Sequence, residues 1–166
     1  PTFHPYCDTM KGTPNITIKV PTAGGKTFIA CNALATIFDA MPMGKTKAVA
    51  WFVPSDTILK QTYQNLKNPL HPYRQKIDTL FNGRVEVYDK QALLYGQNFN
   101  PIVVEEQLSI FVLSIQSFAS TAKDKRLVYS ENEHLTEFTK TYNHHEKRIE
   151  GADETSLIQV IAHLNP

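Results

Sequence analysis

Four short stretches of the chain consist of apolar residues that follow one another or alternate with polar ones. They are Asn15–Val20, Ala48–Val53, Arg84–Tyr88 and Leu108–Ile115. Such runs are typical of β-strands, and a continuous apolar run predicts a strand that is buried on both faces of a sheet. Arg84–Tyr88 alternates, which predicts a third strand or an edge strand.

Between these stretches, apolar residues recur at the spacing of one face of a helix. This pattern predicts helices over Phe28–Ala40, Asp56–Lys67, a short segment ending at Leu80-Phe81, and Ser156–His163. Ser55 or Asp56 is a natural N-cap for the second helix. Strands that alternate with helices in this way favour an α/β fold with a parallel sheet flanked by helices.

The continuous run Ala48–Val53 places Trp51 and Phe52 in the middle of a buried strand, so we expect both rings in the core. The segment Ala119–Gly151 is rich in Lys, Glu, Thr, Asn and His, and predicts a polar insertion that is partly mobile. At 166 residues the chain has the size of one domain.

Composition narrows the class of protein only slightly. Hydrophobic residues make up 42% of the chain and the net charge is +1, which is ordinary for a globular domain and gives no overall basic field. The two cysteines, Cys7 and Cys31, have no metal-binding spacing, and Cys31 is expected to be a buried free thiol. This usage, together with the lack of any apolar stretch near the ~20 residues of a membrane span, predicts a cytoplasmic protein with no membrane partner.

A Gly-Gly-Lys-Thr sequence stands between the first predicted strand and the first predicted helix. Glycines let backbone N–H groups converge on one point, and the positive end of the following helix lies at the same place, so this order is typical of a phosphate-binding loop. The loop predicts ATP and Mg²⁺ as cofactors. An ordinary strand-to-helix turn is the alternative, because Val20 stands where the generic motif has its first Gly. The predicted nucleotide-binding residues are Thr22, Ala23, Gly24, Gly25, Lys26 and Thr27, with Lys26 as the catalytic residue and Thr27 as the Mg²⁺ ligand.

Two further segments resemble motifs of superfamily-two helicases. Pro54-Ser55 follows the strand Ala48–Val53 and precedes Leu59-Lys60-Gln61, and Gln116-Ser117 follows the strand Leu108–Ile115. In that family, hydroxyls and amides at such strand ends contact the nucleic-acid backbone, as phosphate contacts require. The resemblance therefore implies nucleic-acid contacts from Pro54, Ser55, Gln61, Gln116 and Ser117.

The loop sequence Val-Pro-Thr-Ala-Gly-Gly-Lys-Thr resembles most closely that of the translocase (Res) subunit of type III restriction enzymes. Ala23 departs from the pattern at a position where the family usually has Gly. The resemblance implies a RecA-like lobe of an ATP-dependent DNA helicase or translocase associated with restriction endonuclease activity. It also implies double-stranded DNA as a partner and, in the parent protein, a second RecA-like lobe, a nuclease domain and a methyltransferase subunit.

The acidic Asp-Glu-x-His motif of that family does not occur in the sequence. The nearest imitation, Ile102–Glu106, ends in Glu105 and Glu106, which we interpret as a solvated pair at a strand end or in a loop. We therefore expect residues 1–166 to be a single N-terminal RecA-like lobe, a fragment that binds ATP with little or no hydrolysis. There are two alternatives. One is a non-catalytic nucleotide- or DNA-binding module, and the other is a different phosphate-loop enzyme such as a small kinase.

Other clusters are interpreted as solvated surface. His134 with His144-His145 lies in the polar segment, and adjacent histidines rarely share one metal ion. The short run Lys123–Arg126 mixes charges of both signs, as exposed faces commonly do.

Overall fold

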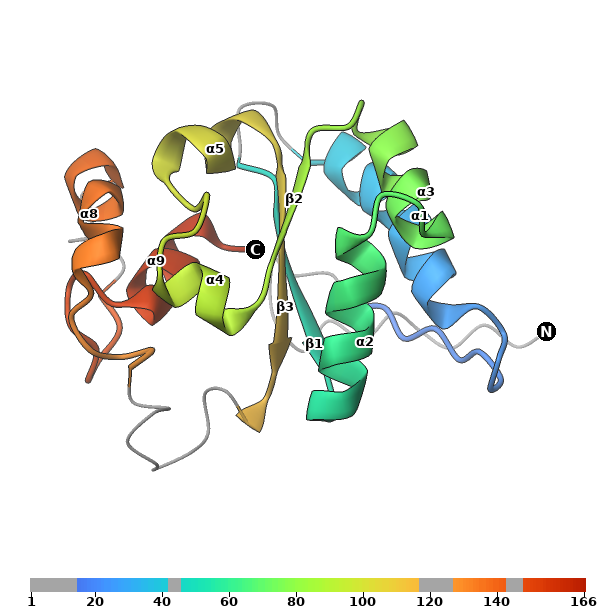
Figure 1. The fold of residues 1–166 in the computed structure, drawn as a ribbon, viewed down its shortest axis with the longest axis horizontal. Helices are drawn as coiled ribbons and strands as arrows, with labels where there is room; N and C mark the ends of the chain where they lie inside the picture. Colours follow the sequence, from blue (N-terminus) through green and yellow to red (C-terminus); the bar gives the residue numbers. More distant parts are fainter. Residues whose placement is uncertain (1–14, 42–45, 117–126, 143–147) are drawn as a thin grey trace.

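A computed structural model of the chain describes residues 15–41, 46–116, 127–142 and 148–166. In these residues a parallel sheet lies between two layers of helices (Figure 1). The sheet has the strand order β1-β3-β2, with bounds Ala48–Val53 for β1, Val85–Tyr88 for β2 and Leu108–Ser114 for β3. The α/β fold predicted from the alternation of strands and helices is confirmed.

The helices divide between the two faces of the sheet. On one face lie α1 (Lys26–Asp39), α2 (Asp56–Lys67) and α3 (Pro72–Leu80) (Figure 1). On the other lie α4 (Lys90–Leu94), α5 (Pro101–Glu106), the 3₁₀ turn η1 (Glu133–Leu135), α8 (Thr136–Tyr142) and α9 (Leu157–Leu164). None of the helices in the described ranges is long and apolar enough to span a membrane.

The central strand β3 supplies both cores. Every one of its residues is buried. Leu108, Ile110 and Val112 pack in the cluster with α1, α2 and α3, whereas Phe111 and Leu113 belong to the cluster of the opposite helices. The continuous apolar run of this strand is explained by its two covered faces.

The strand predicted over Asn15–Val20 is wrong. These residues lie outside any helix or strand, and the side chains of Ile16 and Ile18 are 77% and 60% exposed. A strand needs a neighbour for its backbone hydrogen bonds, and the three strands of the described sheet pair only with one another. The alternating pattern is present, but no strand in the described part of the chain forms a ladder with it.

Strand β1 has the predicted bounds but lies at an edge of the sheet rather than in its interior. As a result, Trp51 is half-buried against the core and Phe52 is 50% exposed. The prediction that both rings are core residues is therefore wrong for Phe52. A run of apolar residues does not distinguish a central strand from an edge strand.

The other edge strand, β2, is covered by basic side chains from the neighbouring helices. Lys67 Nζ donates to the Val87 carbonyl oxygen at 3.2 Å and also pairs with Glu86. Arg74 Nη2 donates to the Val85 carbonyl oxygen at 2.9 Å. These contacts occupy outward-facing acceptors of β2 and thereby protect this edge from pairing with another strand.

Most helix boundaries follow the sequence prediction closely. Helix α2 has the predicted bounds, and its N-cap is Ser55, whose Oγ accepts from the Ile58 N–H at 3.4 Å. Residues Ile102–Glu106 form most of α5 instead of a strand end or loop, because Asn100 caps the helix and Pro101 occupies its first turn.

The described part of the polar segment also contributes to the core. Val128, Leu135 and Phe138 are at most 1% exposed and pack with α9 and the central strand. The sequence predicts no helix or strand in this part of the chain, because its few apolar residues stand among charged and polar ones.

Candidate phosphate-binding site

The Gly-Gly-Lys-Thr sequence leads directly into α1, as predicted. Gly25 is the N-cap residue and Lys26 and Thr27 open the helix. In Figure 1 this end of α1 faces the same side of the molecule as the carboxyl ends of β1 and β3. Ligands of open parallel sheets bind beyond this edge, and the loop faces the same side, but no strand of the described sheet leads into it.

The loop backbone alternates between left-handed and ordinary conformations. The Gly24 N–H donates to the Pro21 carbonyl oxygen at 3.0 Å and closes a tight turn. Ala23 and Gly25 have φ angles of +61° and +74°, whereas Gly24 between them does not have a positive φ. Where residues of opposite hand follow one another, their N–H groups can point toward one concavity, an anion-binding arrangement called a nest. We use this name for the segment Ala23–Gly25.

The two glycines of the loop are required for different reasons. A Cβ atom on Gly24 would lie 2.6 Å from Val20 Cγ1 and 2.9 Å from the Pro21 carbonyl oxygen, so only glycine fits in this space. A Cβ atom on Gly25 would have no heavy atom within 4 Å, but the left-handed φ there disfavours any side chain. The sequence could not reveal the packing of Val20 against Gly24, because it depends on the folded path of the loop.

The positive charges at the site come from Lys26 and from the helix itself. Lys26 Nζ donates to the Pro21 carbonyl oxygen at 2.9 Å, which folds the side chain back across the loop. The first turn of α1 carries no acidic residue, so no side-chain carboxylate there neutralises the positive end of the helix. Thr27 is half-buried beside the loop. These groups are suited to a phosphate. The Pro21 carbonyl, as the acceptor for Lys26, could not be identified from the sequence.

Helix α1 is anchored to the core one turn after the loop. Cys31 is fully buried and Leu34 nearly so, and both pack in the cluster with Ile77 and Phe81. Burial raises the pKa of the Cys31 thiol to about 11, which keeps it protonated and unreactive. The predicted buried thiol is thus confirmed, and its packing fixes the helix whose first residues form the site.

Comparison with protein families matches residues 5–156 to the family described as type III restriction enzyme, res subunit. The chain belongs to this family. Comparison with curated proteins and with solved structures gave no significant match.

Membership of the res-subunit family identifies the architecture in Figure 1 as a RecA-like phosphate-loop fold. It also identifies the chain as an ATP-binding, helicase-like lobe of the superfamily-two kind. Domains of this type generally use ATP and Mg²⁺, and the family generally acts on DNA.

The structure brings together part of the predicted nucleic-acid contact set. Gln116 Nε2 lies 3.5 Å from the Pro54 carbonyl oxygen and donates to it, so the ends of β1 and β3 meet. The Ser55 hydroxyl is engaged as the cap of α2, and Gln61 is exposed on the same helix. Ser117 lies outside the described residues.

The acidic pair Glu105-Glu106 lies far from the phosphate loop. Both residues are exposed at the end of α5, which precedes β3 and therefore lies at the amino edge of the sheet (Figure 1). One of the two carboxylates, that of Glu105, accepts from the Tyr142 hydroxyl at 3.1 Å. Neither carboxylate can serve a metal ion at the opposite edge.

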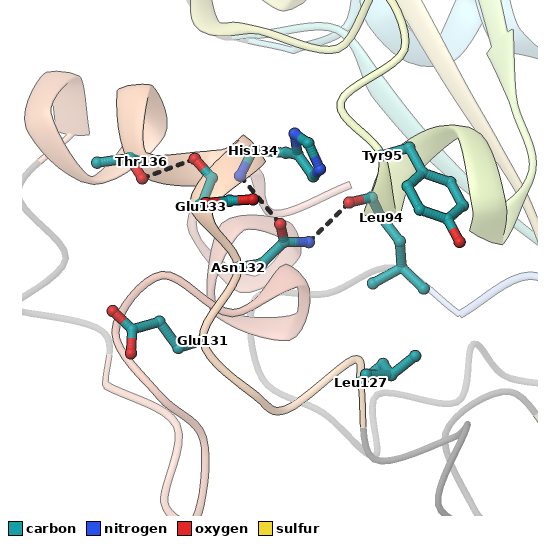
Figure 2. Close-up of a pocket in the computed structure, with 8 residues that line it drawn as sticks. All are labelled: Leu94, Tyr95, Leu127, Glu131, Asn132, Glu133, His134 and Thr136. Atoms are coloured by element: carbon teal, nitrogen blue, oxygen red, sulfur yellow. Dashed lines mark hydrogen bonds between the residues drawn. The ribbon is translucent and has the colours of Figure 1, made fainter.

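A hollow of about 550 Å³ lies on the other face of the sheet, between the end of α4 and the η1 turn (Figure 2). Asn132 links the two sides of this hollow: its amide donates to the Leu94 carbonyl oxygen at 2.8 Å and accepts from the His134 N–H at 3.0 Å. The His134 ring lies 6.3 Å from that of Tyr95. No group of three metal-ligating side chains occurs among the described residues, and His144 and His145 lie outside them.

Proposed function

We propose that this chain is the ATP-binding lobe of a DNA translocase or helicase of the type III restriction enzyme kind. The observation that carries the proposal is the pair of left-handed residues Ala23 and Gly25, on either side of Gly24 and directly before α1, in a chain of the res-subunit family. An ordinary turn into a helix does not need two left-handed residues or a glycine with no room for a Cβ atom.

The residues present fit a Mg²⁺-bound triphosphate. Backbone N–H groups of the loop other than that of Gly24, which bonds to the Pro21 carbonyl oxygen, would hold the phosphate oxygens together with the positive end of α1. Lys26, the predicted catalytic residue, would exchange the Pro21 carbonyl for the outer phosphates, and the Thr27 hydroxyl would be a metal ligand. When bound, Mg²⁺ supplies charge neutralisation at the phosphates.

The edge formed by Pro54 and Gln116 is the proposed contact for the DNA backbone. An exposed Gln61 and the amide of Gln116 offer the neutral donors that phosphate oxygens accept from. Since the chain as a whole carries a net charge of only +1, we expect weak DNA binding that depends on these local contacts.

In the larger enzyme we propose that a second RecA-like lobe closes on this site and couples ATP hydrolysis to movement along double-stranded DNA. A nuclease domain and a methyltransferase subunit would provide restriction and its control. The 166-residue chain by itself should bind nucleotide without turnover, because the Asp-Glu-x-His motif, whose acidic residues hold Mg²⁺ and orient the attacking water, does not occur in its sequence.

The test is a competition assay in which a fluorescent ATP analogue is displaced from residues 1–166 in the presence of Mg²⁺. We expect ATP, ADP and pyrophosphate to displace it, and adenosine to be at least tenfold weaker, since the loop recognises phosphates. Displacement by adenosine as well as by ATP would contradict the proposal.

A parallel assay measures phosphate release from ATP. The expected rate for residues 1–166 is indistinguishable from that of the Lys26→Ala variant. Turnover that Lys26→Ala abolishes would show that a complete catalytic site exists in this chain. A full-length protein that hydrolyses ATP only with double-stranded DNA supports the translocase over a non-catalytic nucleotide-binding module.

A further inference from the structure

The nest in the phosphate loop has one residue that does not suit its conformation. Of the three positions that set the backbone path, Gly24 and Gly25 are glycines, whereas Ala23 has a methyl group at a φ angle of +61°. The left-handed region brings the Cβ atom of an L-residue too close to its own backbone, and glycine alone avoids this cost.

The position of Ala23 in the turn also favours glycine over alanine. Because the Gly24 N–H bonds to the Pro21 carbonyl oxygen, Ala23 is the third residue of a four-residue turn. Turns with a positive φ at this position favour Gly or Asn. The same carbonyl oxygen accepts from Lys26 Nζ, so the turn also determines where the predicted catalytic lysine rests.

We propose that Ala23 is a positioning residue that limits the nucleotide affinity of this chain. Its methyl group penalises the left-handed conformation, so the loop forms the nest in only a fraction of free molecules. Nucleotide binding then carries the cost of ordering the loop, and the apparent dissociation constant is raised by the inverse of that fraction. This inference rests on the proposed nucleotide-binding function.

The proposal predicts a gain of function. Ala23→Gly removes the steric cost while adding some backbone freedom, so we expect Mg·ATP to bind about three- to tenfold more tightly. Ala23→Asn should fall between Ala and Gly, since Asn tolerates the left-handed region better than Ala. Ala23→Val should weaken binding, because a β-branched residue is strongly disfavoured there.

Asn82→Gly is the matched control. Asn82 also has a positive φ, +54°, but it lies in the turn after α3 and outside the loop. The same kind of substitution there should leave the dissociation constant for Mg·ATP unchanged. A similar gain in both variants would show that the effect is general and not a property of the nest.

A second measurement follows the loop without nucleotide. Amide exchange of Gly24, whose N–H is bonded to the Pro21 carbonyl oxygen, should be slower in Ala23→Gly and faster in Ala23→Val than in the natural sequence. Because it needs no nucleotide, this measurement tests the effect of residue 23 on the loop separately from the proposed nucleotide binding.

Slower Gly24 exchange together with tighter Mg·ATP binding in Ala23→Gly supports the inference. Unchanged or weaker binding by Ala23→Gly, while the natural sequence binds Mg·ATP, overturns it and leaves the proposed function standing. If neither protein binds Mg·ATP or pyrophosphate at millimolar concentration, both proposals are wrong, whatever the exchange rates show about the turn.

Discussion

At the scale of single residues, the loop shows that a glycine motif combines several separate requirements. Gly24 is needed for space and Gly25 for conformation, and Ala23 occupies a position with the same conformational demand as Gly25. The sequence could predict the loop and its lysine from their order alone. It could not predict which glycine serves which purpose, because the answer depends on the backbone path past Val20 and Pro21.

This division of roles gives different expectations for Gly24→Ala and Gly25→Ala. The added methyl at Gly24 collides with Val20 and with the Pro21 carbonyl, so the loop must move and Mg·ATP binding should weaken more than tenfold. At Gly25 the methyl meets open space and costs about 1–2 kcal/mol in backbone strain. Titration of both variants with a fluorescent ATP analogue measures the difference.

Gly83→Ala is the control for both, because Gly83 also has a positive φ and no atom near its missing Cβ. It should lose stability to urea but keep its nucleotide affinity. Equal weakening by Gly24→Ala and Gly83→Ala would argue against a specific fit at Gly24.

At the scale of elements, the sequence predicted helices better than it predicted the environment of strands. Helix α2 has the predicted bounds because its cap, its apolar face and its ends all agree. The apolar runs of β1 and β3 look equally buried in sequence, yet β3 is central and β1 is an edge strand. Strand order is set by tertiary packing, which local patterns do not report.

The ion pair that ties α2 to β2 should give the chain an acid-sensitive contribution to stability. Burial by itself raises the pKa of the Glu86 carboxyl, but donors from Lys67, Asn98 and the Val87 N–H outweigh it and hold the pKa below its ordinary value of 4.5. The carboxylate therefore stabilises the folded state above about pH 4.5, and this contribution is lost as the pH falls below that value.

Urea unfolding as a function of pH tests this contribution. Glu86→Gln should be less stable than the natural sequence at pH 7, and the gap should narrow as the pH falls below 4.5. Glu106→Gln, an exposed residue of α5, is the control and should follow the natural sequence at every pH. A gap between Glu86→Gln and the natural sequence that stays constant with pH would refute the assigned role of Glu86.

At the scale of the whole molecule, the two faces of the sheet are built from distant parts of the chain. The face opposite α1 is covered by α9 and by α8. Phe138 of α8 belongs to the segment that the sequence predicts to be a polar insertion. The Phe138 ring lies 4.6 Å from that of Phe99, which also contacts Phe111 of the central strand. This segment is therefore part of the fold, at least over its described residues.

Replacing Phe138 by Ala should destabilise the chain by about 3–5 kcal/mol, because the ring is fully buried and leaves a cavity. Phe52→Ala is the matched comparison: its ring is 50% exposed, so the expected cost is about 1 kcal/mol. Both values come from urea denaturation followed by circular dichroism. A loss at Phe138 no greater than at Phe52 would mean that this face is not a true core.

The central claim concerns the loop that leads into α1. Isothermal titration of Mg·ATP into residues 1–166, compared with Lys26→Ala and with the exposed control Lys140→Ala, tests it most directly. Loss of one charge-assisted contact predicts about 10- to 100-fold weaker binding for Lys26→Ala and no change for Lys140→Ala. Equal affinities for all three proteins would contradict the assignment of this loop as the nucleotide site.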